Sequence, residues 1–186
     1  PDGQLESNER SRELFTKLIQ DKKPDYIYCP TFIDCHPDHV STGRILSDVL
    51  KETQCHAAVR LYEINCPIPP SEINTVIDIT EAFQTKERAV DIFQSQAIDF
   101  DGFIELSKIK TELVPDTKAR AVETFLEIPA AQFPAQFDKI DQKKYPYSQI
   151  FKQVNKAATL LWGILKNVEE KKKMYQERYS GQGGSN

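Results

Sequence analysis

Short apolar runs alternate with amphipathic segments along much of the chain, and this alternation restricts it to few folds. Three runs have the length and side chains of buried strands, at residues 26–29, 57–62 and 76–79. Other segments place apolar side chains at helical spacing, at residues 7–21, 37–52, 80–93, 100–112 and 116–126. Strands that alternate with helices form a mostly parallel sheet covered by helices on both faces. We therefore predict the α/β class.

The composition changes after the domain that we place at residues 1–128. Residues 129–147 are rich in proline, glutamine and aromatic side chains, and we expect a linker there. We predict one long helix over residues 148–179 and a disordered tail at residues 180–186. Apolar side chains in this helix follow coiled-coil steps of four and three, at Val154, Ala158, Leu161, Leu165 and Val168. The helix would pack on the parent domain or pair with a second copy. We favour packing on the parent domain, because only two heptads show an uninterrupted apolar pattern.

Charge and hydropathy exclude two classes of partner. The 24 Lys and Arg residues are outnumbered by 28 Asp and Glu residues, which gives a formal net charge of −4. An acidic chain is poorly suited to bind nucleic acid or an anionic membrane surface. No apolar run approaches the roughly 20 residues that cross a bilayer, so we expect no transmembrane segment.

The four cysteines indicate the cell compartment. Cys29, Cys35, Cys55 and Cys66 form no C-x-x-C pair and no dense framework. A chain of 186 residues can build a core without disulfides. We therefore expect reduced thiols in a cytoplasmic protein, although the even number of cysteines leaves disulfides open.

The segment Asp34-Cys35-His36-Pro37-Asp38-His39 contains two of the three histidines of the chain. It follows a predicted strand and opens a predicted helix, and ligands of α/β sheets bind at such strand ends. The spacing allows both imidazoles to point into one crevice. Asp34 and Asp38 are close enough to orient an imidazole and fix its tautomer. Imidazole and carboxylate groups together are suited to zinc or a similar divalent ion.

Two structural interpretations compete with a functional site. His36 and Asp38 could merely cap the helix that starts at Pro37. A structural zinc knuckle could use Cys29 and Cys35 with the two histidines, but it would lack the usual C-x-x-C hook. Two histidines and two aspartates within six residues favour the functional interpretation.

These residues resemble the second signature of the LmbE/PIG-L superfamily, in which a "kPD" strand leads into a D-x-H-P-D-H motif. Here the strand is Lys23 to Pro30 and the motif is residues 34–39. Further matches follow the order and spacing of the family over residues 1–127. They are Pro1 to Leu5 for "pDG-x-L", Tyr62-Glu63 with Pro67 and Val76 to Thr80 for "yYE…P…vDIT", Lys86 to Ala89 with Ser95-Gln96 for "K-x-x-A…SQ", and Ala121 to Phe125 for "AEaF".

The resemblance implies a Rossmann-like sheet and a zinc-dependent hydrolase that removes acetyl groups from N-acetylglucosamine units. The substrate would be an N-acetylated sugar or glycoconjugate. The family pattern places a metal-ligand role on His39. It places an acid or electrostatic role at the tetrahedral intermediate on His36, and a supporting role on Asp38.

The departure from the family is large. Its first signature, H-P-D-D-E, supplies the other histidine, an aspartate ligand and the catalytic base, and this sequence contains no such segment. The only methionine is Met174 and the first residue is Pro1, so we expect a piece of a longer protein. His56 is isolated and cannot replace the missing ligands. We expect the chain alone to be inactive. The alternative is a non-catalytic family member that acts as an interaction module through residues 148–179.

Overall fold

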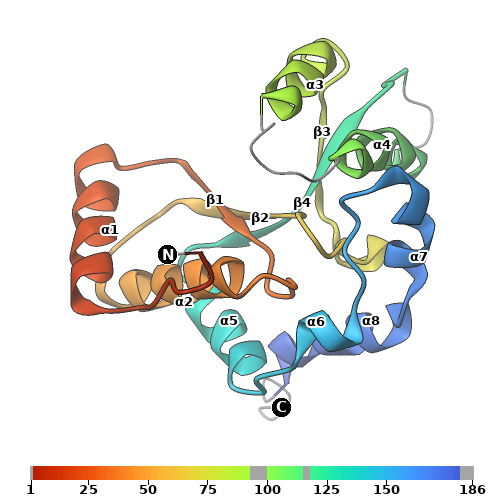
Figure 1. Ribbon diagram of the computed structural model, residues 1–186. Helices are drawn as coiled ribbons and strands as arrows, with labels where there is room; N and C mark the ends of the chain where they lie inside the picture. The colour runs from red at the N-terminus through yellow and green to blue at the C-terminus, as the bar shows by residue number, and fades with distance from the viewer. Residues whose placement is uncertain (1, 93–99, 115–117, 181–186) are drawn as a thin grey trace, which may run out of the picture.

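The structure is a computed structural model that describes residues 2–92, 100–114 and 118–180. Figure 1 shows the arrangement of its helices and strands. In chain order they are α1 (Glu9–Lys22), β1 (Tyr26–Pro30), α2 (Pro37–Glu52), β2 (Ala58–Tyr62), β3 (Thr75–Asp78), α3 (Phe83–Asp91), α4 (Asp101–Ile109), β4 (Val122–Pro129), α5 (Phe133–Asp141), α6 (Tyr147–Ile150), α7 (Leu160–Leu165) and α8 (Val168–Gln176).

The four strands form one sheet in the order β1-β2-β4-β3. β1 and β2 are parallel and are joined by α2, which makes a βαβ unit. β4 runs antiparallel to both of its neighbours, β2 and β3. The α/β class is therefore confirmed, but the sheet is mixed, and the prediction of a mostly parallel sheet is wrong.

β4 is the reason for this difference. The sequence predicted a helix over residues 116–126, of which the structure describes 118–126 and places residues from Val122 onward in a strand. Val122, Thr124 and Phe125 are β-branched or aromatic, and such side chains favour a half-buried pleated surface. Both neighbours of β4 supply backbone partners, so tertiary pairing overrides the weak helical pattern.

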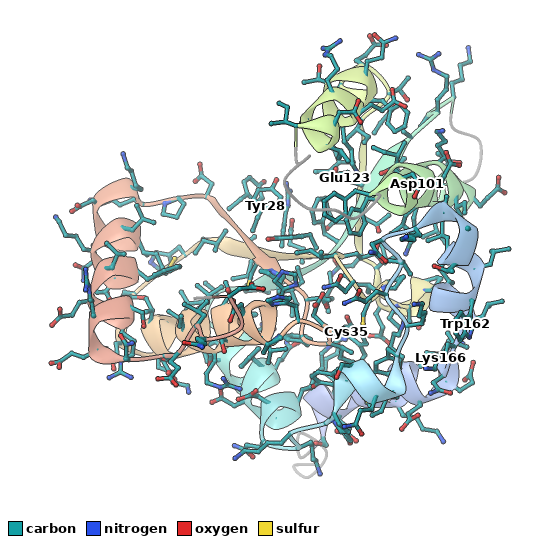
Figure 2. The ribbon with its side chains drawn as sticks, viewed as in Figure 1. Tyr28, Cys35, Asp101, Glu123, Trp162 and Lys166 are labelled. Carbon is teal, nitrogen blue, oxygen red and sulfur yellow. The ribbon has the colours of Figure 1, made fainter. Side chains whose placement is uncertain are left out.

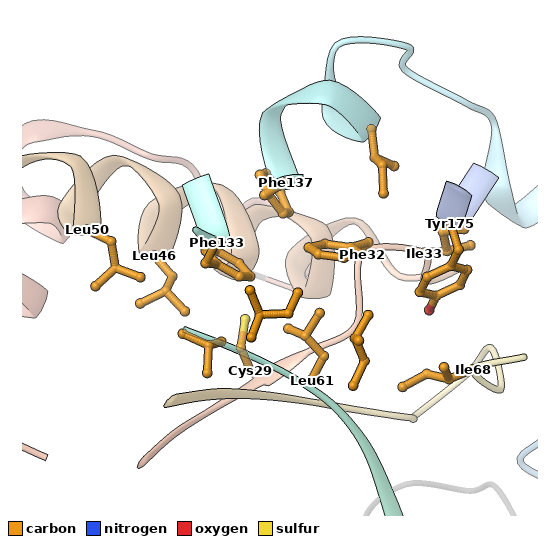
Figure 3. Packing of buried hydrophobic residues seen from close by; sticks show 14 of the residues in the cluster. Cys29, Phe32, Ile33, Leu46, Leu50, Leu61, Ile68, Phe133, Phe137 and Tyr175 are labelled. Carbon is orange, nitrogen blue, oxygen red and sulfur yellow. The ribbon is translucent and has the colours of Figure 1, made fainter. Parts of the chain in front are cut away.

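The main hydrophobic core lies between the sheet and the pair α2 and α5, which contact each other along their length. Figure 3 shows this packing, in which aromatic rings from the β1–α2 loop and α5 meet side chains of the parallel strands. The labelled members are Cys29, Phe32, Ile33, Leu46, Leu50, Leu61, Ile68, Phe133, Phe137 and Tyr175. On the opposite face of β1, Tyr26 and Tyr28 are about half exposed, at 49% and 52%.

Local signals explain where the first two helices begin. The Asn8 side chain accepts the backbone N–H of Ser11, whose hydroxyl in turn accepts the Asn8 N–H, which is a capping box at the start of α1. α2 begins at Pro37, as the sequence predicted, and His36 is its N-cap, which was part of the competing structural interpretation. α3 has no side-chain cap at its N-cap residue Ala82, and the Thr80 hydroxyl, two residues earlier, accepts the Arg120 N–H.

The C-terminal segment is helical but divided. The single helix predicted over residues 148–179 is replaced by α6, α7 and α8, and Asn167 adopts a left-handed φ of 53° between the last two. The proposed seam does not form, because Leu161 and Leu165 are exposed while Val154 is buried outside any helix. The predicted linker contains α5, which belongs to the main core.

Some predictions concern residues outside the described part of the chain. These are Pro1, the Ser95-Gln96 pair and residues 181–186 of the expected tail. Within the described ranges, no helix combines the length and the apolar character needed to cross a membrane.

We expect Gly43→Ala to destabilise the protein. A Cβ atom at Gly43 would overlap the ring of Phe137, which is itself packed between Phe32 and Phe133. At an exposed helical position this substitution would stabilise by about 1 kcal/mol, whereas overpacking a core costs about 1–3 kcal/mol. Urea denaturation should therefore show a net loss of up to about 2 kcal/mol. In a Phe137→Leu background the same change should cost less, and an equal cost in both backgrounds would contradict this packing.

Candidate active site

The histidine cluster lies where the loop after β1 meets the first turn of α2, at the carboxyl ends of the two parallel strands. The Thr31 N–H donates to the carbonyl oxygen of Tyr62 at 3.0 Å and so continues the β1–β2 pairing into this loop. Residues 31–34 are all buried, which holds the loop against the core. The label of Cys35 in Figure 2 shows that this loop lies near the centre of the molecule.

The structure brings His36 and His39 together, as the sequence predicted. Their ring centroids are 4.8 Å apart, and their side chains are partly exposed, at 31% and 25%. The Asp38 N–H donates to Nδ1 of His36 at 3.2 Å, so His36 also caps α2. An acceptor at Nδ1 leaves the proton of a neutral His36 ring on Nε2.

Asp34 is the organising group of the site. Its side chain is fully buried, and its carboxylate accepts the His36 N–H at 2.8 Å. Asn65 donates to it twice, from the backbone at 3.1 Å and from the side-chain amide at 2.8 Å. Oδ1 of Asp34 also lies 2.9 Å from Nδ1 of His39. A carboxylate at that distance accepts a hydrogen bond from Nδ1–H, which leaves the Nε2 lone pair of His39 free to bind a metal.

The carboxylate of Asp38 does not orient an imidazole, and that expectation is corrected. Its two carboxylate oxygens accept the backbone N–H groups of Gly3 and Leu5, at 2.8 and 2.9 Å. The hydrogen bonds from Leu5 and Gly3 lower the pKa of Asp38 below its ordinary value of 3.8. Asp38 therefore fixes the N-terminal segment beside the site. This segment places Oδ1 of Asp2 3.4 Å from Nε2 of His36.

The residues near the two histidines differ in how well they could bind a metal. Among the described residues, Asp2, His36 and Asp38 place one ligand atom each within 4.8 Å of one another. This group suits a metal poorly, because Asp38 already accepts two backbone amides and the Asp2 side chain is 92% exposed. His39 is the better ligand, because its free nitrogen is oriented by a buried carboxylate.

The zinc knuckle considered from the sequence does not form. Cys29 is 1% exposed and belongs to the hydrophobic core. The sulfur of Cys35 lies 3.3 Å from the sulfur of Cys66, and both thiols are free. Neither cysteine of the proposed knuckle therefore joins the imidazoles as a ligand.

Asn65 and Asp2 contact the histidine cluster, and neither was predicted as a site residue. Asn65 follows β2, whose carboxyl end lies beside that of β1, and a polar residue at this place was a usable signal. The side chain of Glu63, next to Tyr62 at the end of β2, is 7% exposed and accepts a hydrogen bond from Lys110 at 2.8 Å as half of an ion pair. His56 is exposed, just before β2, as expected.

No protein-family model matches the chain, and no curated protein matches its sequence. Solved structures share its fold. N,N'-diacetylchitobiose deacetylase from Pyrococcus horikoshii has a TM-score of 0.55 and 21% identity, over 69% of this chain and 55% of that one. A conserved protein from Thermus thermophilus has a TM-score of 0.53 and 19% identity, over 68% of this chain and 61% of that one. The likeness is one of fold, and this chain spans less than two thirds of either protein.

We expect Asn65→Ala to destabilise the protein by about 1–3 kcal/mol, because it removes the side-chain amide that donates to the buried Asp34 carboxylate. Asn74→Ala is the matched control. Asn74 also makes two hydrogen bonds, to the backbone of Glu127, but it is exposed, so water can replace them. Urea denaturation of both variants measures the difference. Equal losses would show that the charge of Asp34 does not depend on Asn65.

Proposed function

We propose that this chain supplies one metal ligand and one acid–base residue to a zinc-dependent de-N-acetylase site. The observation that carries the proposal is the pairing of the buried Asp34 carboxylate with Nδ1 of His39, which presents Nε2 as a ligand. The fold is shared with a protein described as a diacetylchitobiose deacetylase. Together with the D-x-H-P-D-H motif, this supports the LmbE/PIG-L resemblance and an N-acetylated sugar or glycoconjugate as substrate.

A divalent metal bound at His39 would act as a Lewis acid toward the acetamide carbonyl. His36 would act on the same carbonyl from the adjacent position, since the two rings are 4.8 Å apart. Its Nε2 carries the proton and can donate to the developing oxyanion or to the departing amine. Asp38 keeps His36 in this tautomer through its backbone N–H, and it holds the N-terminal segment through its carboxylate.

The site needs further residues to work. Catalytic zinc sites use three protein ligands, and the described residues of this chain offer one that is well oriented. Within the described residues β1 pairs only with β2, so its other edge is open beside the histidine loop. We propose that the remaining ligands and the catalytic base come from a segment encoded upstream of Pro1. Such a segment would reach the site from this edge.

The test is zinc content and acetate release from N-acetylglucosamine and diacetylchitobiose, using the protein extended by its native upstream residues. We expect about one zinc per chain and measurable acetate release. His39→Ala should lose both, because it removes the oriented ligand. His36→Ala should keep the zinc while turnover falls about 10²–10³-fold, since a stabilising donor is lost.

His56→Ala is the control, because His56 is an exposed histidine outside the cluster. It should change neither zinc content nor acetate release. An extended protein that contains no zinc and releases no acetate would defeat the proposal. Equal zinc loss in His39→Ala and His56→Ala would defeat the ligand assignment alone.

An alternative function, an interaction module in the C-terminal segment, is favoured by a separate observation. Three large apolar side chains of α7 face solvent: Leu161, Trp162 and Leu165 are 65%, 57% and 64% exposed. Figure 2 shows Trp162 and Lys166 at the outer edge of the molecule. Exposed apolar groups clustered on one short helix are typical of a contact surface. The proposed contact is self-association through α7.

Sedimentation velocity over a range of concentrations tests this alternative. Self-association through α7 should appear as a sedimentation coefficient that rises with concentration, and Trp162→Ser with Leu165→Ser should remove that rise. Leu14→Ser with Leu18→Ser is the matched control, because these two leucines are exposed on α1, at 65% and 51%. A monomer at all concentrations, or equal effects of both pairs, would contradict self-association through α7.

A further inference from the structure

Two of the four cysteines place their sulfur atoms close together at the histidine loop. Sγ of Cys35 and Sγ of Cys66 are 3.3 Å apart, although the residues are 31 positions apart in the sequence. Cys35 stands between Asp34 and His36, and Cys66 follows Asn65. The two thiols therefore belong to the same two loops that Asp34 and Asn65 join by hydrogen bonds. Both thiols are free.

The two thiols differ in access and acidity. Cys35 is partly exposed, whereas Cys66 is fully buried. The hydrogen bond from Cys66 lowers the pKa of Cys35, and the same bond together with burial raises the pKa of Cys66. The nearby ammonium of Lys171 also favours a Cys35 thiolate, and the Asp34 carboxylate opposes it. The more accessible thiol is thus also the better nucleophile.

We propose that Cys35 and Cys66 form a reversible dithiol–disulfide pair that takes small disulfides, such as oxidised glutathione, as its oxidant. This inference does not depend on the deacetylase proposal. The sulfur atoms need to approach by little more than 1 Å to reach the length of a disulfide bond. Cys29, in the core, and Cys55, before β2, take no part in the pair.

The reaction runs in two exchange steps. The Cys35 thiolate attacks one sulfur of oxidised glutathione, forms a mixed disulfide and releases one glutathione thiolate. Cys66 loses its proton to solvent, attacks the Cys35 sulfur and releases the second glutathione thiolate. The two cysteines give up two electrons and two protons, and one oxidised glutathione becomes two reduced glutathione molecules. Excess reduced glutathione or a dithiol reverses both steps.

The bond would tie together the two loops that carry Asp34 and Asn65. It would close a chain segment that contains all of α2, and a closed loop of this length restricts the unfolded chain strongly. The oxidised protein should therefore be more stable than the reduced protein. The Asp34–Asn65 contacts, which orient His39, would be held by a covalent link in addition to hydrogen bonds.

The experiment treats the 186-residue chain with oxidised glutathione and maps its peptides by mass spectrometry without reduction. We expect a single link between Cys35 and Cys66, removed by dithiothreitol. The melting temperature should rise by roughly 5–10 °C on oxidation. Cys35→Ser should abolish both the link and the rise, whereas Cys55→Ser, which changes another partly exposed thiol, should leave both unchanged.

Three outcomes would overturn the proposal. One is an oxidised wild-type protein without the Cys35–Cys66 link. Another is a link formed equally well by Cys29 or Cys55. The third is a melting temperature that rises to the same extent in the wild-type protein and in Cys35→Ser. Since none of these measurements uses metal or acetyl substrate, failure of the deacetylase proposal would leave this test intact.

Discussion

The buried charge of Asp34 is the constraint on which the rest of the site depends. A carboxylate removed from water must be matched by donors, because an unmatched buried charge is very costly. Here the donors come from two segments: the His36 amide and the His39 ring from the junction of the β1–α2 loop with α2, and Asn65 from the loop after β2. Satisfying the charge therefore also fixes the distance between the loops and the tautomer of His39. The stability of this loop pair and the orientation of its ligand are consequences of one interaction.

The C-terminal segment contacts this site, although it lies outside residues 1–127, which resemble the LmbE/PIG-L superfamily. The Tyr175 hydroxyl on α8 is hydrogen-bonded to Thr31, which starts the histidine loop. Arg178 forms a buried ion pair with Glu72 at 2.7 Å, next to the loop that carries Asn65 and Cys66. Lys171 is buried with its ammonium 5.0 Å from the ring centre of Phe151. These polar anchors give α8 one defined position, which an apolar seam alone would specify less sharply.

The parts of the fold that the sequence predicted are those with local signals. Pro37 and the cluster before it set the start of α2 and the position of the histidines, and the structure agrees. β4 was missed because a short apolar segment suits a helix or a strand until its neighbours are known. The division of the last helix was missed for a similar reason. The position of Tyr175 depends on Thr31, a partner 144 positions away, which no pattern within the last helix reveals. Asn65 was missed because its role depends on a strand pairing that no local pattern specifies.

Metal binding and completion of the sheet are coupled if the proposed function holds. The open edge of β1 and the histidine loop are parts of one continuous stretch, residues 26–39. A strand that pairs with this edge satisfies exposed backbone groups and can bring further ligands to His39 at the same time. A metal that bridges those ligands in turn stabilises the paired strand, because binding energy at a site absent from the separated parts becomes folding energy. The preorganised Asp34–His39 pair lowers the entropy cost of this step, since the ligand held on this chain needs no reorientation.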